Sequence, residues 1–297
     1  MDGNDVARRL FDAPPAWAGL ELFASAAGRI TYAQARAGML AYAGWLGETQ
    51  GTRPGDHVAI CLPKTLETVQ AILGVLALGA VYVPLQYQGP PARLGAILAS
   101  LKPKLLLTTR DMAGRIRAAS HLSASAIRTV EVSSEEESLV VLRRKAEPRR
   151  AIAEVTRQDL AVIYFTSGST GEPKGVMWSQ RGMAASIASL HQWRRMISAD
   201  RLISISGLHY SASCEIFYPI LSGASIYLGG DHETMFGDRL AAVLERERTT
   251  IWSAAATSLR MLVEAGNLAE RELSPLRRIE IFGERMPIPA LHAAMAV

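Results

Sequence analysis

The chain has 297 residues, of which 49% are hydrophobic and 20% are charged. These proportions are those of a folded globular protein and exclude a wholly disordered chain. The formal net charge of +4 is small, and the basic residues between Arg143 and Arg150 directly follow an acidic run at 135–137. Because the chain lacks a sustained basic stripe, its charge pattern argues against a nucleic-acid-binding surface.

The cysteines, the N-terminus and the longest apolar run narrow the class of protein further. Cys61 and Cys214 each lie in an apolar stretch without metal-ligand spacing, so we expect two buried thiols and no protein metal site. The N-terminus is acidic and polar, unlike a signal peptide. The longest apolar run, 71–85, is too short to span a bilayer. The sequence therefore predicts a soluble cytoplasmic protein with no membrane span.

Strand-like and helix-like patterns alternate along the chain. The apolar run 58–62 is followed by helical spacing over 66–78 and by a second strand-like run at 81–85. This is the length expected of a parallel crossover. The later predicted elements are helix 91–101, strands 104–108 and 160–166, helix 182–196, strands 201–205 and 225–228, helix 239–247, strand 250–252, helix 257–264 and strand 278–282.

This alternation predicts an α/β fold with mostly parallel sheets and flanking helices, in which ligands bind at the carboxyl ends of strands. The polar stretch 133–156 is the best candidate for an internal boundary. We therefore expect a first α/β subdomain over 1–150 and a second over 151–297.

A loop rich in glycine and hydroxyl groups directly follows the apolar strand 161–165. Its glycines allow close approach of backbone N–H groups to an anion, and its hydroxyls and lysine add donors and positive charge. The spacing is not that of a Walker loop, because Pro173 precedes the lysine and Gly175 follows it. We interpret the segment as a flap that closes over phosphates, with a plain surface turn as the alternative. The candidate phosphate-binding residues are Thr166, Ser167, Gly168, Ser169, Thr170, Gly171 and Lys174.

The string 164–176 resembles the signature loop of the AMP-binding superfamily of adenylate-forming enzymes. That superfamily comprises acyl-CoA synthetases, aryl-acid ligases, luciferases and the adenylation domains of nonribosomal peptide synthetases. Segments 30–34, 76–85, 221–228 and 281–284 resemble further motifs of the superfamily in order and spacing. The likeness covers nearly the whole chain and implies the large N-terminal domain of that fold.

The resemblance implies a ligase that works in two steps. A carboxylate attacks the α-phosphate of Mg-ATP to give an acyl-adenylate and pyrophosphate, and a thiol of coenzyme A or of carrier-protein phosphopantetheine then takes the acyl group. Hydroxyls, amides, Lys174 and Mg²⁺ can neutralise the negative charge that spreads in such a transfer. Gly283 and Glu284 match the turn whose backbone lies against the adenine, with Phe282 in place of the first glycine.

The segment 207–213 resembles the part of the superfamily that lines the acyl pocket, which makes Ser211 and Ala212 candidate substrate-binding residues. Amino-acid-activating relatives carry an aspartate where this chain has Ser211. A hydroxyl does not offset a buried ammonium, so we expect an acid without an α-amino group. His209 is the candidate catalytic residue, as a donor to the developing charge, with a structural histidine as the alternative. Glu215 could face the pocket or be structural.

The chain ends at Val297, before the superfamily's later motifs for Mg²⁺ and ribose and before its small C-terminal domain with the catalytic lysine. We therefore expect a truncated chain, incomplete for full catalysis. Three interpretations stay open: part of an active ligase that works with a separate C-terminal domain or carrier protein, an inactive nucleotide-binding or interaction module, and a decayed reading frame. The identity of the acid and acceptor and the oligomeric state are left open by the sequence.

Overall fold

The computed structural model describes residues 5–120, 127–132, 146–167 and 172–283, together with residues 285, 288 and 292. Within these ranges each predicted strand and helix is present, with its ends within two residues of the prediction. The α/β fold class, with mostly parallel sheets flanked by helices, is confirmed.

Two six-stranded sheets form the framework. Sheet A has the strand order β12-β11-β9-β10-β1-β2, and sheet B has the order β6-β5-β3-β4-β7-β8. The strands of sheet A are β1 (Glu21–Ser25), β2 (Gly28–Thr31), β9 (Arg201–Ser204), β10 (Ser225–Leu228), β11 (Ile251–Ala254) and β12 (Arg278–Ile281). Those of sheet B are β3 (His57–Cys61), β4 (Val81–Pro84), β5 (Leu105–Thr109), β6 (Thr129–Val132), β7 (Leu160–Ser167) and β8 (Pro173–Ser179).

Each sheet is parallel except for one antiparallel pair at an edge, β1–β2 in sheet A and β7–β8 in sheet B. Each sheet also contains strands from both the first and the second half of the chain. The N-terminal β1 pairs with β10, and β7 pairs with β4. The predicted division at residue 150 stays a prediction. Strands β1 and β2, which precede it, belong to sheet A, and strands β7 and β8, which follow it, belong to sheet B.

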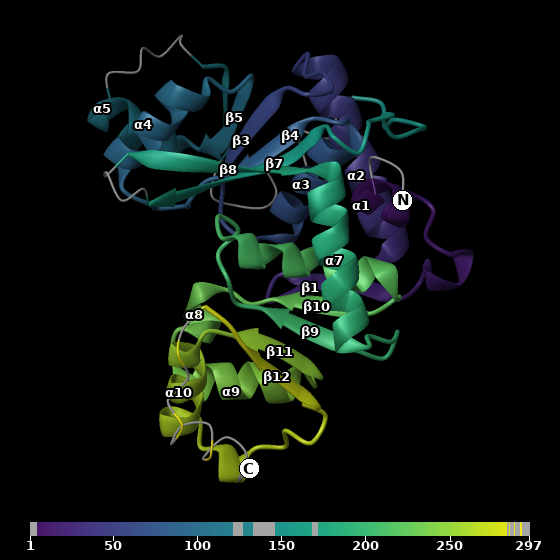
Figure 1. Ribbon diagram of the computed structural model, residues 1–297, viewed down its shortest axis with the longest axis vertical. Coiled ribbons are helices and arrows are strands. Elements are labelled where there is room, and N and C mark those ends of the chain that lie inside the picture. The colour runs from purple at the N-terminus through teal and green to yellow at the C-terminus, as the bar shows by residue number, and fades with distance from the viewer. Residues whose placement is uncertain are drawn as a thin grey trace.

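Helices cover both sheets (Figure 1). The longer ones are α2 (Tyr32–Gly44), α3 (Leu66–Ala77), α4 (Pro91–Leu101), α5 (Arg110–Ala119), α7 (Gln180–Arg194), α9 (Gly237–Arg246) and α10 (Ala256–Ala265). The shorter ones are α1 (Asp5–Phe11), α8 (Asp231–Thr234) and the turns η1 (Pro15–Trp17), η2 (Trp45–Thr49), η3 (Ser211–Leu221) and η4 (Leu268–Glu270).

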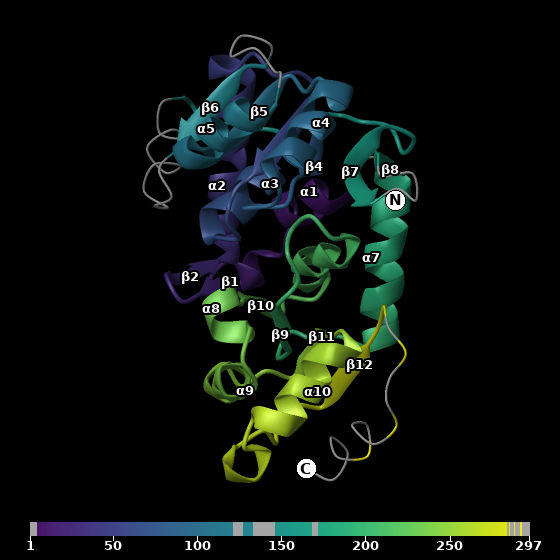
Figure 2. The ribbon, with the colours of Figure 1, turned by 90° about the vertical axis from the view of Figure 1, so that its left-hand side faces the viewer.

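Helix α3 packs against α1, α2 and β4, and every one of its residues is buried. Its sequence is apolar almost all round, as expected of a helix without a solvent face. The backbone of α2 comes so close that a Cβ at Gly74 would lie 2.4 Å from the Cβ of Tyr42. A glycine is therefore required at this crossing. Helix α7 runs from hairpin β7–β8 down to β12, so it connects the two sheets (Figure 2).

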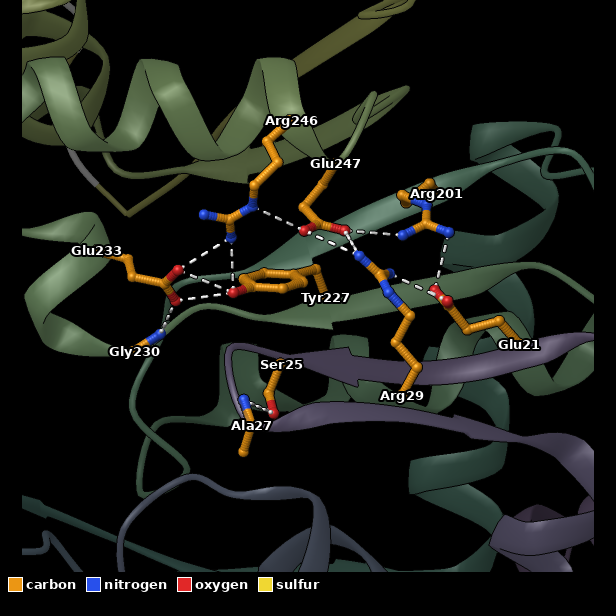
Figure 3. A network of polar contacts seen from close by, with 10 residues as sticks. All are labelled: Glu21, Ser25, Ala27, Arg29, Arg201, Tyr227, Gly230, Glu233, Arg246 and Glu247. Atoms are coloured by element: carbon orange, nitrogen blue, oxygen red, sulfur yellow. Dashed lines mark hydrogen bonds and ion pairs between the residues drawn. The ribbon is translucent and has the colours of Figure 1, made fainter.

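A network of ion pairs joins β1, β2 and β9 to the end of α9 (Figure 3). Glu247, whose side chain is 2% exposed, accepts from Arg29 at 2.9 Å, from Arg201 at 2.9 Å and from Arg246 at 3.0 Å. Burial raises the pKa of Glu247, but the hydrogen bonds from Arg246 and Arg29 outweigh it and hold the pKa below its ordinary value. Glu21 completes the network by pairing with Arg29 and Arg201.

Some local features differ from the sequence prediction or extend it. The predicted flap 166–175 is shorter than expected, because Thr166 and Ser167 end β7 and residues 173–175 begin β8. The expected buried thiols, Cys61 and Cys214, are confirmed. Across the described ranges, no helix is both long and apolar enough to cross a bilayer.

Candidate functional site

A cavity of about 480 Å³ lies where hairpin β7–β8, the start of α4 and the segment after β9 meet; we call it the hairpin cavity. Three of the predicted site residues, Thr166, His209 and Ser211, lie around it. Its lining residues are Gln86, Arg93, Tyr164, Phe165, Thr166, Val176, Trp178, His209, Tyr210 and Ser211.

The register of hairpin β7–β8 decides which residues face the cavity. Thr166 lies opposite Lys174, and Tyr164 lies opposite Val176. Directly opposite residues of antiparallel strands project from the same face, so Lys174 shares the face of Tyr164, Thr166 and Val176. The Thr166 hydroxyl donates to the Lys174 carbonyl at 3.5 Å. The exposed Lys174 and the exposed Thr166 thus lie opposite each other at the loop end of the hairpin.

His209 lies in the loop between β9 and η3. Its ring packs on the ring of Tyr210 with centroids 4.0 Å apart, and its Nε2 is buried without a hydrogen-bond partner among the described residues. Burial and then the charge of Arg93 lower the pKa of His209. The imidazole is therefore neutral near pH 7, with one nitrogen free to bond to a ligand.

Ser211 and Ala212 begin the 3-10 helix η3, whose N-cap is Tyr210. Ser211 is exposed and lines the hairpin cavity, whereas Ala212 is half-buried and does not. Glu215 is 2% exposed, and its Oε1 has no partner in the described part of the chain. Tyr164, on the opposite wall, is held by hydrogen bonds to Tyr82 at 3.0 Å and to the Cys214 sulfur at 3.1 Å. Glu215 does not line the hairpin cavity, and among the described residues that do, Arg93 alone carries a formal charge.

A second cavity of about 380 Å³ adjoins the first and shares Gln86, His209 and Tyr210 with it. Lys64, after β3, lines this second cavity and donates to the carbonyls of Ser204 at 2.8 Å and Ser206 at 3.1 Å. These bonds tie the end of β9 in sheet A to sheet B. Burial lowers the pKa of Lys64, although the negative charges of Glu215 and Asp231 oppose that fall.

The remaining predicted nucleotide-binding residues are placed less fully. Gly168, Ser169, Thr170, Gly171 and Glu284 lie outside the described residues, and Ser167 ends β7. Gly283 follows β12 at a φ of 83° and lines neither cavity. The structure therefore brings together the start of the phosphate loop and the acyl-side residues, but it does not bring Gly283 to the same cavity.

Two cationic residues of these cavities, Lys64 and Arg93, are missing from the sequence prediction. Neither belongs to a local motif. Their positions follow only from how the loop after β3 and the start of α4 meet the segment after β9. The spacing of charges along the chain therefore gives no signal for either residue.

The family model described as "AMP-binding enzyme" matches residues 13–297. The chain belongs to this family. Pyochelin synthetase PchF of Pseudomonas aeruginosa is 30% identical over 73% of this chain and 11% of its own length. The L-proline--[L-prolyl-carrier protein] ligase of Streptomyces coelicolor is 29% identical over 82% of this chain and 48% of its own. The chain thus spans less than half of either relative.

The fold of the AMP-binding enzymes is also found by structural comparison. The crystal structure of ATP-bound MatB from Rhodopseudomonas palustris superposes with a TM-score of 0.86, covering 99% of this chain and 57% of MatB at 20% identity. The family is one of adenylate-forming ligases that use ATP and Mg²⁺. The family membership predicted from the sequence is therefore confirmed.

Proposed function

We propose that this chain takes part in activating a carboxylic acid as an acyl-adenylate, for transfer to a thiol of coenzyme A or of carrier-protein phosphopantetheine. The observation that carries the proposal is the hairpin cavity, where Thr166 at the start of the phosphate loop lies on one side and His209 and Ser211 lie on the other. A nucleotide phosphate and an acid can therefore approach each other within one cavity.

The phosphate side of the proposal rests on the hairpin. Lys174 and the hydroxyl of Thr166 supply positive charge and a donor, and the sequence assigns Ser167, Gly168, Ser169, Thr170 and Gly171 to the same phosphates. Such groups act by positioning the phosphates and offsetting the charge that develops on them. Magnesium is held in sites of this kind largely through substrate phosphates and water, and no residue of this chain is assigned to it. Gly283 and Glu284 remain the residues assigned to the adenine.

The acid side rests on the segment after β9. The neutral His209 has its buried Nε2 free to bond to an oxygen of the acid or of the α-phosphate as they react. Ser211, with Ala212 beside it, is assigned to the acid. No acidic residue lines the hairpin cavity in the described part of the chain. An α-ammonium group would therefore lack a counter-charge there, which supports an acid without an α-amino group.

ATP–pyrophosphate exchange with a panel of acids tests this function. We expect exchange with fatty, hydroxy, keto or aryl acids. We expect the exchange rate to fall in His209→Ala and in Lys174→Ala, while calorimetric titration still detects ATP binding to these variants. Highest exchange with an unmodified α-amino acid would refute the assignment of the acid. Binding of ATP without exchange for any acid would refute activation and favour a nucleotide-binding module. The thiol acceptor and a cytoplasmic location remain predictions from the sequence and its relatives.

A further inference from the structure

Arg93 differs from the other half-buried arginines near the sheets. It is the third residue of α4, it lines the hairpin cavity, and among the described residues it makes no hydrogen bond or ion pair. By contrast, Arg201 pairs with two glutamates and Arg271 pairs with Glu245 at 3.0 Å. A guanidinium carries five donors, and holding it half-buried without an acceptor is unfavourable.

The surroundings of Arg93 add to its positive potential. Helix α4 has no acidic residue in its first turn and no side-chain cap at its N-terminus. The positive end of the helix dipole therefore lies beside the guanidinium, which is an unfavourable place for a cation unless an anion is bound. The lining of the hairpin cavity in the described residues contains no carboxylate that could act as this anion. A bound anionic ligand would supply the counter-charge that the described lining lacks.

His209 supplies a second, independent sign of a ligand. It lines the same cavity as Arg93, and its buried Nε2 has no partner in the described ranges. The charge of Arg93 reaches it, because that charge contributes to lowering the pKa of His209. Gln86, which carries an amide, and Thr166, which carries a hydroxyl, also line this cavity. The cavity therefore presents a forked cation, an imidazole and two neutral polar groups.

We infer that Arg93 and His209 form an oxyanion-binding site in the hairpin cavity, which takes a carboxylate or phosphate group of a ligand. The inference rests on the proposed function for the ligand's origin and adds a substrate-binding residue to it. Arginine suits this role because its planar fork matches two oxygens of a carboxylate or phosphate. In the proposed reaction the group is either the carboxylate of the acid or a phosphate of ATP or of the pantetheine acceptor.

The test compares Arg93→Gln with Arg110→Gln in the whole chain. Arg110 is a matched control, because it also lies in the first turn of a helix, α5, but it is exposed and lines neither cavity. Benzoate, hexanoate, pyrophosphate and 4′-phosphopantetheine are titrated by calorimetry at low ionic strength. We expect Arg93→Gln to weaken the carboxylates or the phosphates about tenfold, and Arg93→Lys to weaken them less.

The class of probe that is weakened identifies the source of the oxyanion. Selective loss of benzoate and hexanoate assigns the site to the acid, whereas selective loss of pyrophosphate or phosphopantetheine assigns it to a phosphate. Unchanged affinities in Arg93→Gln overturn the inference, as does an equal loss in Arg110→Gln or the failure of every probe to bind the unmodified chain. Thermal unfolding midpoints within about 2 °C of the unmodified chain show that the variants are folded.

A titration of His209 by NMR tests whether the side chains of Arg93 and His209 lie together, as the proposed site requires. Removing the neighbouring positive charge in Arg93→Gln should raise the pKa of His209, and Arg110→Gln should leave it unchanged. An unchanged pKa in Arg93→Gln would contradict the placement of the two side chains. If oxyanions bind through Arg93 but the chain shows no ATP–pyrophosphate exchange, the proposed function alone is refuted. If exchange occurs and Arg93→Gln does not change it, this inference alone is refuted.

Discussion

Replacing Gly207 by alanine should displace His209 without unfolding the chain. An added Cβ at Gly207 would lie 2.7 Å from Cε1 and 2.9 Å from Nδ1 of His209. Non-bonded carbon atoms prefer about 3.5–4.0 Å, so the imidazole has to move by about 1 Å. The two cavities beside His209 leave room for this movement. We therefore expect a change of less than about 1 kcal/mol in the free energy of unfolding.

The same displacement should strongly reduce activity. A misplacement of about 1 Å at a reacting group reduces the rate about a hundredfold, so kcat/KM for ATP–pyrophosphate exchange should fall by about that factor. Gly114→Ala is the matched control, because it adds the same methyl group to α5 with no atom within 4 Å. Full exchange activity in Gly207→Ala would refute the role of His209. The fall in kcat/KM corresponds to a rise in activation free energy. If the free energy of unfolding falls by as much as that, the proposed free movement of the His209 ring is refuted.

Three further predictions concern stability. Glu280→Gln should lower the free energy of unfolding by about 3 kcal/mol, because it leaves Arg194, whose side chain is 5% exposed, without its counter-charge. Glu247→Gln should lower it by about 2 kcal/mol, since the three arginines around it are partly exposed and keep other acidic partners. Burial raises the pKa of Asp200, but the hydrogen bonds from Arg277, Ile197 and Thr250, together with the charge of Arg277, outweigh it and hold the pKa below its ordinary value of 3.8. The stabilisation by Asp200 is therefore full above pH 3.8 and is lost as the pH falls through the lowered pKa. The difference between the unmodified chain and Asp200→Asn in urea unfolding should therefore shrink on acidification.

A surface ion pair provides the control for these measurements. Arg117 and Glu131 are 2.6 Å apart, but their side chains are 40% and 27% exposed. Glu131→Gln should change the free energy of unfolding by less than about 1 kcal/mol. If Glu280→Gln lowers it no more than Glu131→Gln does, burial is not what makes the Arg194–Glu280 pair important. A constant effect of Asp200→Asn between pH 6 and pH 3 would likewise contradict the lowered pKa.

The sequence predicts the parallel strands well because they are buried on both faces. Strands β3, β4 and β5 are almost wholly buried, so each reads as a short apolar run between breakers. Hairpin β1–β2 escapes prediction because β2 is an edge strand without a buried residue and because β1 depends on pairing with the distant β10. Helix α2 does carry a signal, the capping box of Thr31 and Gln34.

Strand β8 explains why the phosphate loop predicted from the sequence is too long. Pro173, Lys174 and Gly175 are typical of a turn, yet they begin an edge strand. Proline is tolerated at the first residue of such a strand, and β7 supplies the hydrogen-bonding partner that the local sequence does not reveal. Tertiary pairing therefore overrides composition here.

For the candidate site, motif likeness points to Thr166, His209 and Ser211, and the structure places all three around one cavity. Motif likeness does not point to Arg93. A single arginine in a helix is ordinary in sequence, and what sets it apart is the lack of a partner once the chain is folded. Contacts that depend on two distant segments carry no local pattern, which is why this residue emerges only from the structure.

The exchange of strands between the sheets has a consequence for synthesis on the ribosome. Hairpin β1–β2 is made first, but its parallel partner β10, where Phe23 lies opposite Ile226, follows about two hundred residues later. Until then the edge of β1 that faces away from β2 has no partner in sheet A. We expect the nascent chain to hold this hairpin loosely and to need protection from aggregation. A fragment ending near residue 150 would keep that unsatisfied edge permanently.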